Sequence, residues 1–347
     1  LSPHANKLLE HREGLLMNFH YPMSRPLVGD MNRRGALSAF GGFGAMAALS
    51  GCSDEQPAPA SRGNLNEVSI DFTDPAQNLR SYIRLQGNLD SSKVSVGYYS
   101  GTIYNVVGDW KKVTPLCGLS GIGVRRIEPQ PENKYRVFNR ELAFYSDIRT
   151  GEFVDVWDNP LNNERVEVLP IQNMTVNAEI APIFEFDMEG TIIRRPFNPP
   201  WEILNGSALA LFEVHQELKS ELQPEEWPRE SSGPMMRISE LFHRHCRAAD
   251  LDNQDLTSVP YIGTWMRLAP YLPWMLMGQT EGHLFYRCSM HKFTRVQDLP
   301  QAFLDKAERE YPDFLEPPKP ESWGTPNNSS FNVYKDTRTP MPPTDQG

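Results

Sequence analysis

The segment from Tyr135 to Arg195 most constrains the fold, because short runs of β-branched and aromatic residues alternate there with turn residues and show no helical periodicity. The expected strands are Tyr135–Asp147, Glu152–Trp157, Arg165–Leu169, Asn173–Ile180, Pro182–Met188 and Thr191–Arg195, with turns at Thr150-Gly151, Asn159–Asn163 and Glu189-Gly190. Consecutive strands without intervening helices favour an antiparallel meander. We therefore predict a mainly β (α+β) fold: an antiparallel β-barrel or strongly curved meander sheet, calycin-like, with a few peripheral helices.

The rest of the chain fits this class, because 30 Pro and 24 Gly break it into runs too short for an all-helical protein. Helices are expected from Asp74-Pro75 onward, over Met236–Ala249, and over Leu299–Tyr311 with Asp298 as the cap. Strands are expected over 94–107, 116–124 and 281–294, while 206–220 reads as either strand or helix. A closed barrel of about eight strands can hold one small ligand.

The N-terminal region carries an export signal. Arg33-Arg34 precedes a weakly apolar Gly/Ala-rich run that ends in Leu49-Ser50-Gly51-Cys52, and the arrangement resembles a twin-arginine signal followed by a lipoprotein processing site with Cys52 as the lipidated residue. We expect residues 1–30 to be a non-native or mis-called leader, 31–52 the signal, 53–66 a flexible tether, 67–318 one β-rich domain and 319–347 a disordered tail. The protein is then periplasmic or a membrane-anchored lipoprotein.

Charge narrows the set of partners. The chain has a formal net charge of −10, and removal of the segment before Cys52, with five basic and three acidic residues, leaves −12. This balance argues against nucleic acid and anionic membrane surfaces, so a membrane is expected as a partner only through the lipid anchor. The three other cysteines, Cys117, Cys246 and Cys288, allow at most one disulfide, for which Cys246 and Cys288 are candidates.

Several motifs fail as sites on spacing or context. The glycines of Leu116–Val124 lack the residues of a phosphate loop, and the acids Glu185, Asp187 and Glu189 read as a solvated strand face. His243 and His245 would diverge by about 200° on the predicted helix, and His283 and His291 would be about 27 Å apart on a strand. We predict neither a metal site nor a cofactor.

The stretch Trp265–Gly282 is the best candidate for a ligand site. Two Trp, one Tyr, three Met and two Pro surround a single arginine, Arg267. Soft and aromatic side chains suit an apolar cavity, and Arg267 can bind a carboxylate, carbonyl or phenolate. The alternative is that these side chains fill the barrel mouth as ordinary core, with Arg267 paired to a structural acid. The candidate ligand residues here and in the last strand are Trp265, Tyr271, Trp274, Met277 and Tyr286.

Motifs in this chain resemble the bacterial family DUF1838 over about Phe72–Pro318. They are Arg149-Thr-Gly-Glu152, Trp157-x-Asn159-Pro160, Glu167-Val168, Asn173-x-x-Val176-Asn177, Trp265-x-Arg267, Pro273-Trp274-Met275-x-Met277-Gly278 and Gly282. The chain has Asn173-Met-Thr-Val176 where the family pattern is Asn-Asp-Pro-Val, and Pro170 where a His is frequent. The resemblance implies a mainly β domain and frequent export, and it adds Trp157, Asn159 and Asn173 to the candidate ligand residues.

Three functions remain open. In the first, an exported β-barrel binds a small apolar or aromatic molecule such as a terpenoid, steroid or phenolic. In the second, the same cavity is a metal-independent lyase, isomerase or cyclase, in which Arg267 polarises an oxygen and His215 or His283 moves a proton. In the third, the chain is a structural or interaction lipoprotein.

Overall fold

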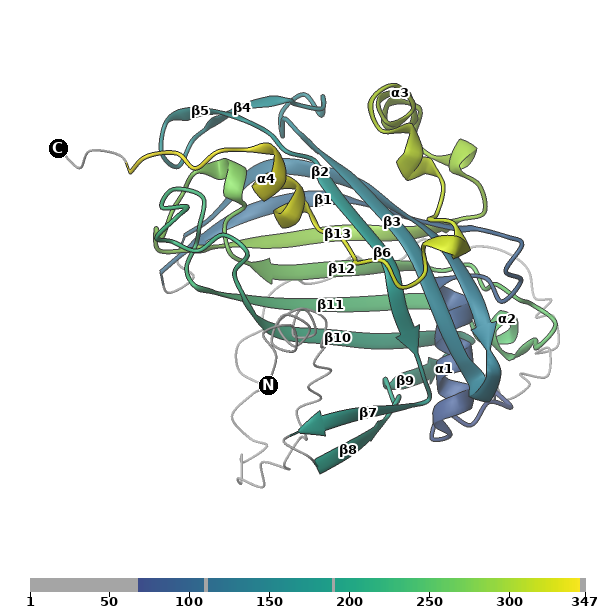
Figure 1. Cartoon of the computed structure of the whole chain (residues 1–347). Helices are drawn as coiled ribbons and strands as arrows, with labels where there is room; N and C mark the ends of the chain where they lie inside the picture. Colours follow the sequence, from purple (N-terminus) through teal and green to yellow (C-terminus); the bar gives the residue numbers. More distant parts are fainter. Residues whose placement is uncertain (1–67, 109–111, 189–190, 344–347) are drawn as a thin grey trace, which may run out of the picture.

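The fold is built on one large antiparallel sheet that curls around its own interior (Figure 1). The structure is a computed structural model that describes residues 68–108, 112–188 and 191–343. Nine strands follow one another in the order β6-β3-β2-β1-β13-β12-β11-β10-β9. They are β1 (Ser95–Val107), β2 (Lys112–Gln130), β3 (Lys134–Ser146), β6 (Ile171–Ile180), β9 (Trp201–Leu204), β10 (Ser207–Lys219), β11 (Met235–Arg247), β12 (Ile262–Ala269) and β13 (His283–Phe293).

The sheet joins two meanders. Strands β1, β2 and β3 pair in chain order, and so do β9 to β13. The last strand, β13, then pairs with the first, β1, and this seam makes one sheet of the two halves. No ladder joins β6 to β9 within the described ranges, so the sheet is strongly curved but open. The predicted mainly β fold is confirmed, in its curved-sheet form.

Two smaller hairpins leave the main sheet. One consists of β4 (Val156–Asn159) and β5 (Glu164–Glu167), and the other of β7 (Ile183–Met188) and β8 (Thr191–Pro196). The turn predicted at Glu189-Gly190 lies outside the described residues. The predicted return strand Glu152–Trp157 was wrong: only one bridge, Ser146 to Phe153, precedes β4. A turn closes at Thr150-Gly151, where the Gly151 N–H donates to the Asp147 carbonyl. The N–H groups of Arg149 and Thr150 donate to the Asp147 carboxylate.

Helix α1 (Pro75–Gln86) closes one end of the concave side of the sheet (Figure 1). It begins as predicted, because the Asp74 carboxylate accepts a hydrogen bond from Ala76 N–H and Pro75 needs no partner for its nitrogen. Its residues Leu79, Tyr82 and Ile83 are buried against β2, β3 and β10. Full burial of such side chains stabilises the fold by roughly 1.5–3 kcal/mol each.

The other end of the concave side is filled by the β4–β5 hairpin, the short helix η3 (Pro273–Met275) and α4 (Ser330–Thr337). The outer face of the sheet is covered by α3 (Gln301–Glu310), where Phe303 and Ala307 pack on Val124 and Phe144. Short turns complete the chain. They are η2 (Pro131–Asn133), α2 (Ala248–Asp252), η4 (Val296–Asp298), η5 (Pro312–Leu315) and η6 (Pro320–Ser322).

Three sequence predictions in this region were wrong. The expected helix Met236–Ala249 is strand β11, because the neighbouring strands β10 and β12 pair with it along its length. Asp298 does not cap α3; it lies in η4 and pairs with Arg295, and the helix begins after Pro300. The tail predicted to be disordered contains α4, whose Ser329–Asn332 capping box and buried Tyr334 anchor it.

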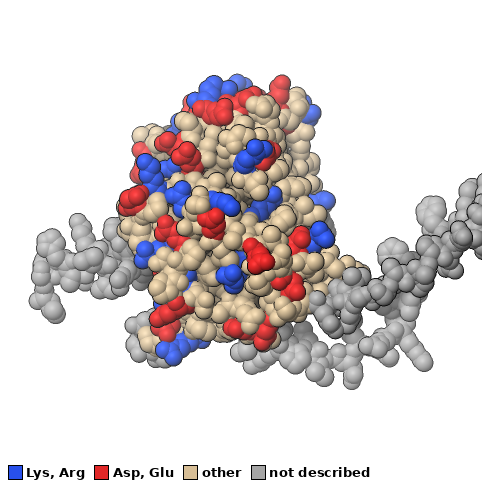
Figure 2. Space-filling view, turned by 90° about the vertical axis from the view of Figure 1, so that its right-hand side faces the viewer, with Lys and Arg blue, Asp and Glu red and all other residues tan. Residues whose placement is uncertain are grey.

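The surface is mixed in charge. Lys and Arg side chains alternate with Asp and Glu over the face that contains α1 and α2, and no single sign dominates it (Figure 2). None of the helices in the described ranges is both long and apolar enough to cross a membrane.

Candidate functional site on the concave face

A row of charged and aromatic side chains crosses the concave face near its middle. Glu240 of β11 lies opposite Arg267 of β12, and Arg267 lies opposite Tyr286 of β13. Directly opposed residues on neighbouring strands place their side chains on one face. Arg267 Nη1 lies 4.0 Å from Glu240 Oε1, and the two side chains are 20% and 22% exposed. Solvent therefore reaches this pair, although the Tyr286 ring beside it is buried.

A second carboxylate, Glu141 of β3, is held by hydrogen bonds. The Tyr99 hydroxyl donates to Glu141 Oε1 at 2.8 Å, and Asn173 Nδ2 donates to Oε2 at 2.7 Å. Asn173 is itself oriented by α4, because its Oδ1 accepts from the backbone N–H and the hydroxyl of Ser330 at 2.9 and 3.1 Å. The first turn of α4 thus fixes the position of Glu141 through Asn173.

Trp265 of β12 lies between the two carboxylates. Its Nε1 donates to Glu240 Oε1 at 3.2 Å. Its ring is edge-on to Tyr99, with 5.0 Å between ring centres, and 5.7 Å from the Tyr286 ring. Gly121 of β2 makes room for the Tyr99 ring, since a Cβ there would lie 2.4 Å from it. Aromatic surface and charged groups therefore meet at one place.

The electrostatics of this cluster shift the pKa of Glu240 upward. Burial raises the pKa of Glu240, the Arg267 guanidinium opposes the rise, and the Glu141 charge adds to it. Because Glu240 is 22% exposed, water screens part of this effect. Burial is the largest single effect on the pKa of Arg267 and lowers it, but Glu240, Tyr286, Glu141 and Tyr145 together outweigh burial and the net direction is upward. Burial and Glu141 hold the pKa of the Tyr99 phenol well above its usual range.

Such a set can act without a metal. A carboxylate held beside a cation can take a proton from a bound molecule and return it. A fixed guanidinium can stabilise negative charge on a substrate oxygen. Tyr99 and Trp265 supply flat apolar surface beside both groups.

The other predicted ligand residues lie deeper, in the packed end of the concave side. Trp157, Tyr271, Trp274 and Met277 are each less than 10% exposed and belong to the cluster that also contains Trp265 and Tyr286. The Trp274 ring is edge-on to Trp157 at 5.6 Å between ring centres. Tyr271 donates a hydrogen bond to Asn105 Oδ1 at 2.7 Å. The structure thus brings all of them together beneath the Arg267 row.

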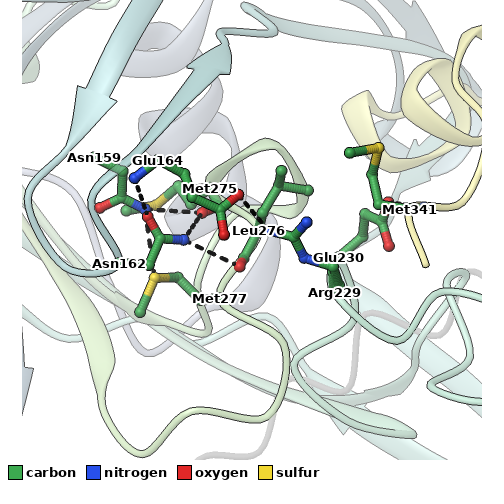
Figure 3. A network of polar contacts seen from close by, with 9 residues as sticks. All are labelled: Asn159, Asn162, Glu164, Arg229, Glu230, Met275, Leu276, Met277 and Met341. Carbon is green, nitrogen blue, oxygen red and sulfur yellow. Dashed lines mark hydrogen bonds and ion pairs between the residues drawn. The ribbon is translucent and has the colours of Figure 1, made fainter. Parts of the chain in front are cut away.

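Two asparagines of the β4–β5 hairpin hold the irregular segment after β12 (Figure 3). Asn159 Nδ2 donates to the Met275 carbonyl at 2.8 Å and contacts Met277 Sδ at 3.4 Å. Asn162 Nδ2 donates to the carbonyls of Met275 and Leu276, both at 3.2 Å. Leu276 has a left-handed backbone with φ 54°, which the two amides stabilise. Asn159 therefore positions this segment rather than reaching the charged row.

The two histidines predicted to act with Arg267 do not lie near it. In β10, Phe212 and Val214 are buried on the concave side, and His215 follows Val214, so it points to the outer face. There His215 Nδ1 lies 3.0 Å from Ser239 Oγ. His283 alternates in the same way with the buried Leu284 and Tyr286 of β13. Strand alternation keeps both imidazoles away from the concave side. The groups near Arg267 that could transfer a proton are instead the carboxylates Glu240 and Glu141.

Two other histidines, His243 and His245, lie on β11. On strand β11, His243 and His245 share the outer face instead of diverging as they would on a helix. No group of three or more His, Cys, Asp or Glu able to hold a metal ion occurs among the residues that the structure describes. Cys117, Cys246 and Cys288 are buried free thiols, so the suggested pairing of Cys246 with Cys288 is not formed. Cys52 lies outside the described residues.

Sequence reasoning missed Glu141, Glu240 and Tyr99. Glu141 stands in the strand predicted over Tyr135–Asp147, where the alternating residues Val137, Ala143 and Tyr145 are buried. A single acid in the inward register of such a strand is the signal that would have found it. Glu240 gave no such signal, because its segment read as a helix.

Comparison with known proteins agrees with these motifs. A family model described as "Protein of unknown function (DUF1838)" matches residues 92–338, well over half of the chain. The chain belongs to the DUF1838 family. The match spans all nine strands of the curved sheet, the charged row and α4, whereas α1 lies before it. Family membership therefore covers the site but assigns no activity to it.

No curated protein matches the chain at a significant level. A solved structure described as "lipid-protein interactions in lipovitellin" resembles 59% of the chain at 10% sequence identity, with a TM-score of 0.24. The chain spans only 25% of the length of that structure. A likeness this weak carries no statement about the ligand of this DUF1838 protein.

Proposed function

We propose that this protein binds a small molecule with an apolar or aromatic body and an oxygen function on the concave face of its sheet. Arg267 and Glu240 contact the oxygen, and Trp265 and Tyr99 contact the body. The observation that carries the proposal is the partial exposure of Arg267 and Glu240, at 20% and 22%, inside an otherwise buried aromatic cluster. Such a combination is typical of small-molecule sites.

The energetic cost of the pair supports a functional role. Replacing a buried ion pair by packed apolar residues is often neutral or stabilising by roughly 1–4 kcal/mol. The Arg267–Glu240 separation of 4.0 Å is too long for a strong hydrogen bond. Arg267 Nε also has no hydrogen-bond partner in the described part of the chain. The unsatisfied donor of Arg267 supports a ligand oxygen as its partner.

A second candidate is a metal-independent isomerase, lyase or cyclase acting on the same molecule. The observation that favours it is the raised pKa of Glu240 beside a cation. In an isomerisation, Glu240 takes a proton from the carbon next to a carbonyl, Arg267 stabilises the negative oxygen that forms, and the proton returns at another atom. Atoms and charge balance without a cofactor.

Export is a separate proposal. The Arg33-Arg34 pair and the Leu49-Ser50-Gly51-Cys52 sequence support secretion by the twin-arginine route and lipidation of Cys52. A periplasmic or membrane-anchored location suits a protein that takes up an apolar molecule, because the lipid anchor keeps it beside a membrane in which such molecules dissolve.

Binding is tested by intrinsic fluorescence of the full chain titrated with a panel of phenols, terpenoid alcohols and sterols. Trp265 lies in the site, so a bound ring should change its emission. Arg267→Ala should weaken binding of the oxygen-bearing probes, whereas Arg237→Ala on the outer face, 82% exposed, should not. If no probe changes the emission, or if Arg267→Ala binds as wild type does, the proposal fails.

The enzyme candidate needs a different readout. Any ketone that binds is incubated with the protein in D₂O, and deuterium uptake at the adjacent carbon is followed by NMR. Wild type should catalyse the exchange, and Glu240→Gln should lose it while still binding the ketone. Equal exchange in both proteins would remove Glu240 as the proton carrier.

A further inference from the structure

A second buried cation, Arg244, stands on the same face of β11 as Glu240. Four residues of extended strand separate the two by about 13 Å. Arg244 is 4% exposed. Its guanidinium carbon lies 5.0 to 5.6 Å from the centres of three aromatic rings, which belong to Tyr82 of α1, Phe242 and Tyr261. Arg244 is thus enclosed between α1 and the sheet.

Arg244 has no acidic partner. Its Nε and Nη1 atoms are buried and have no hydrogen-bond partner within the described ranges, and no carboxylate there lies within ion-pair distance of it. The contrast with Arg84 is sharp. Arg84 is fully buried, but its guanidinium donates to the carbonyls of Leu251, Leu256, Asp250 and Asn253.

Two further cations lie near Arg244, and one acid, Glu141 of β3, stands opposite Gly123 and acts on Arg125. Arg125 of β2 donates through Nη1 to the Gln86 carbonyl at 2.9 Å and to the Gln86 side chain. Lys292 of β13 donates to the carbonyls of Arg84, Gly87 and Val259 at 2.7, 2.7 and 3.2 Å. Burial, with Arg125 and Arg244 adding to it, holds the pKa of Lys292 well below its usual range. The partners of both cations are neutral.

The sheet leaves room beside these cations. Gly97 of β1 and Gly123 of β2 are cross-strand partners. A Cβ at Gly97 would meet nothing closer than 3.9 Å, where the Tyr261 hydroxyl is one of its two neighbours. A Cβ at Gly123 would lie 3.2 Å from Asn139 Oδ1 and 3.7 Å from Arg125 Nη2. The two glycines therefore form a small floor next to Arg125 and Tyr261, and Asn139 and Glu141 of β3 border it.

Two buried nitrogens of Arg244 lack a partner in the described ranges, and Glu141 is already held by Tyr99 and Asn173, so these features favour an anion from outside. An arginine keeps its charge at any physiological pH, so it cannot escape burial by losing a proton. A buried charge without a partner is costly, and an anion that pairs with it recovers that cost. The forked guanidinium matches the oxygens of a carboxylate or a phosphate.

We propose that Arg244 and Arg125 bind the oxyanion group, carboxylate or phosphate, of an organic acid. This inference rests on the proposed function and names the class of molecule. The acid group lies at the α1 end, against Arg244 and Arg125. The body extends along Phe242 and Trp265, whose rings are stacked 6.4 Å apart, toward Arg267 and Glu240. A molecule of this class carries its acid and its second oxygen on opposite ends of a rigid apolar body.

The test is calorimetric titration of the full chain with matched probes. These are 6-hydroxy-2-naphthoate, its neutral amide, and 2-naphthyl phosphate beside 2-naphthol. A charged probe should bind at least about 30-fold more tightly than its neutral partner, as expected when a buried cation gains or loses its counter-charge. The tighter of the two charged probes identifies the oxyanion as carboxylate or phosphate.

Variants locate the effect. Arg244→Met should remove the preference for the charged probe, Arg244→Lys should keep part of it, and the outer-face variant Arg237→Met should leave it unchanged. Because it removes an unpaired buried charge, Arg244→Met should melt at the same temperature as the ligand-free wild type or higher.

The outcomes separate the two proposals. Equal binding of charged and neutral probes, or an undiminished preference in Arg244→Met, overturns the oxyanion site and leaves the proposed function standing. Failure of every naphthyl probe and of the wider phenol, terpenoid and sterol panel overturns both. A clear loss of stability in Arg244→Met would show a structural guanidinium and overturn the oxyanion site.

Discussion

Replacing Arg84 by Met should destabilise the protein strongly, although Arg84 is far from the charged row. Arg84 stands in the last turn of α1, is 0% exposed, and donates to four carbonyls of the segment 250–256. Methionine has a similar stem and fills most of the space, so the main effect is loss of these hydrogen bonds.

The magnitude follows from the burial of each bond. The bond to the Leu251 carbonyl, at 2.8 Å, is buried, and its loss leaves an unsatisfied acceptor at a cost of about 1–3 kcal/mol. The other three bonds are partly exposed, and water can replace them at a cost of roughly 0.5–1 kcal/mol each. Removing a buried charge offsets part of the sum, so we expect a net loss of about 3 kcal/mol. For a domain of this size that is a fall in Tm of about 6–12 °C.

Calorimetry and amide hydrogen exchange measure the effect. The Tm should fall as stated, and the amides of residues 250–259 should lose protection before the strands do. Arg80→Met, an exposed arginine of the same helix, should change stability by less than about 0.5 kcal/mol. If Arg84→Met melts within 2 °C of wild type with unchanged exchange in 250–259, the assignment of these bonds as the anchor of the loop is refuted.

Three further predictions concern other regions. Burial raises the pKa of Cys117, Cys246 and Cys288 to about 12, so these thiols should resist iodoacetamide at pH 8 in the native state and react in denaturant. An unfolded thiol has a pKa of about 9, so the stability that comes from these raised pKa values is complete below about pH 9 and is lost as the pH rises toward 12. A melting temperature that stays constant between pH 9 and 12 would contradict this. Tyr334→Ala should lower the free energy of unfolding in denaturant by about 3–5 kcal/mol, because Tyr334 is buried against Trp227. The neighbouring Lys335→Ala should cost less than about 1 kcal/mol. A loss that small in Tyr334→Ala would mean that α4 is not docked. Cys52→Ser should move the protein from the membrane fraction to the soluble one, and unchanged fractionation would argue against the lipid anchor.

The sequence was a good guide where period and turn chemistry agree. Asp74-Pro75 correctly predicted the start of α1, and the strand predicted over 281–294 is β13. The aromatic stretch after Trp265 was correctly seen as one cluster, although the strand β12 carries its first residues.

The wrong prediction of a helix for β11 arose because inward positions of this strand hold charged residues. In β11 the inward residues include Glu240 and Arg244, which break the apolar alternation of a strand. What remains, Ile238, Leu241 and Phe242, happens to match helical spacing. The same two charged residues are the candidate site, so the local rule failed where function is expected to override it. No local pattern can show that Glu240 of β11 lies near enough to Glu141 of β3 to feel its charge, since this proximity depends on the curvature of the whole sheet.

The β1–β13 seam has a consequence for how the protein reaches its folded state. Its partners, such as Tyr99 and Met290, are separated by most of the chain, so the seam forms only after almost the entire polypeptide is available. Pairing over such sequence distances is slow, and until it occurs both halves present an open strand edge that other chains can capture. An export route that carries folded proteins would let this step finish in the cytoplasm, where chaperones can shield those two edges.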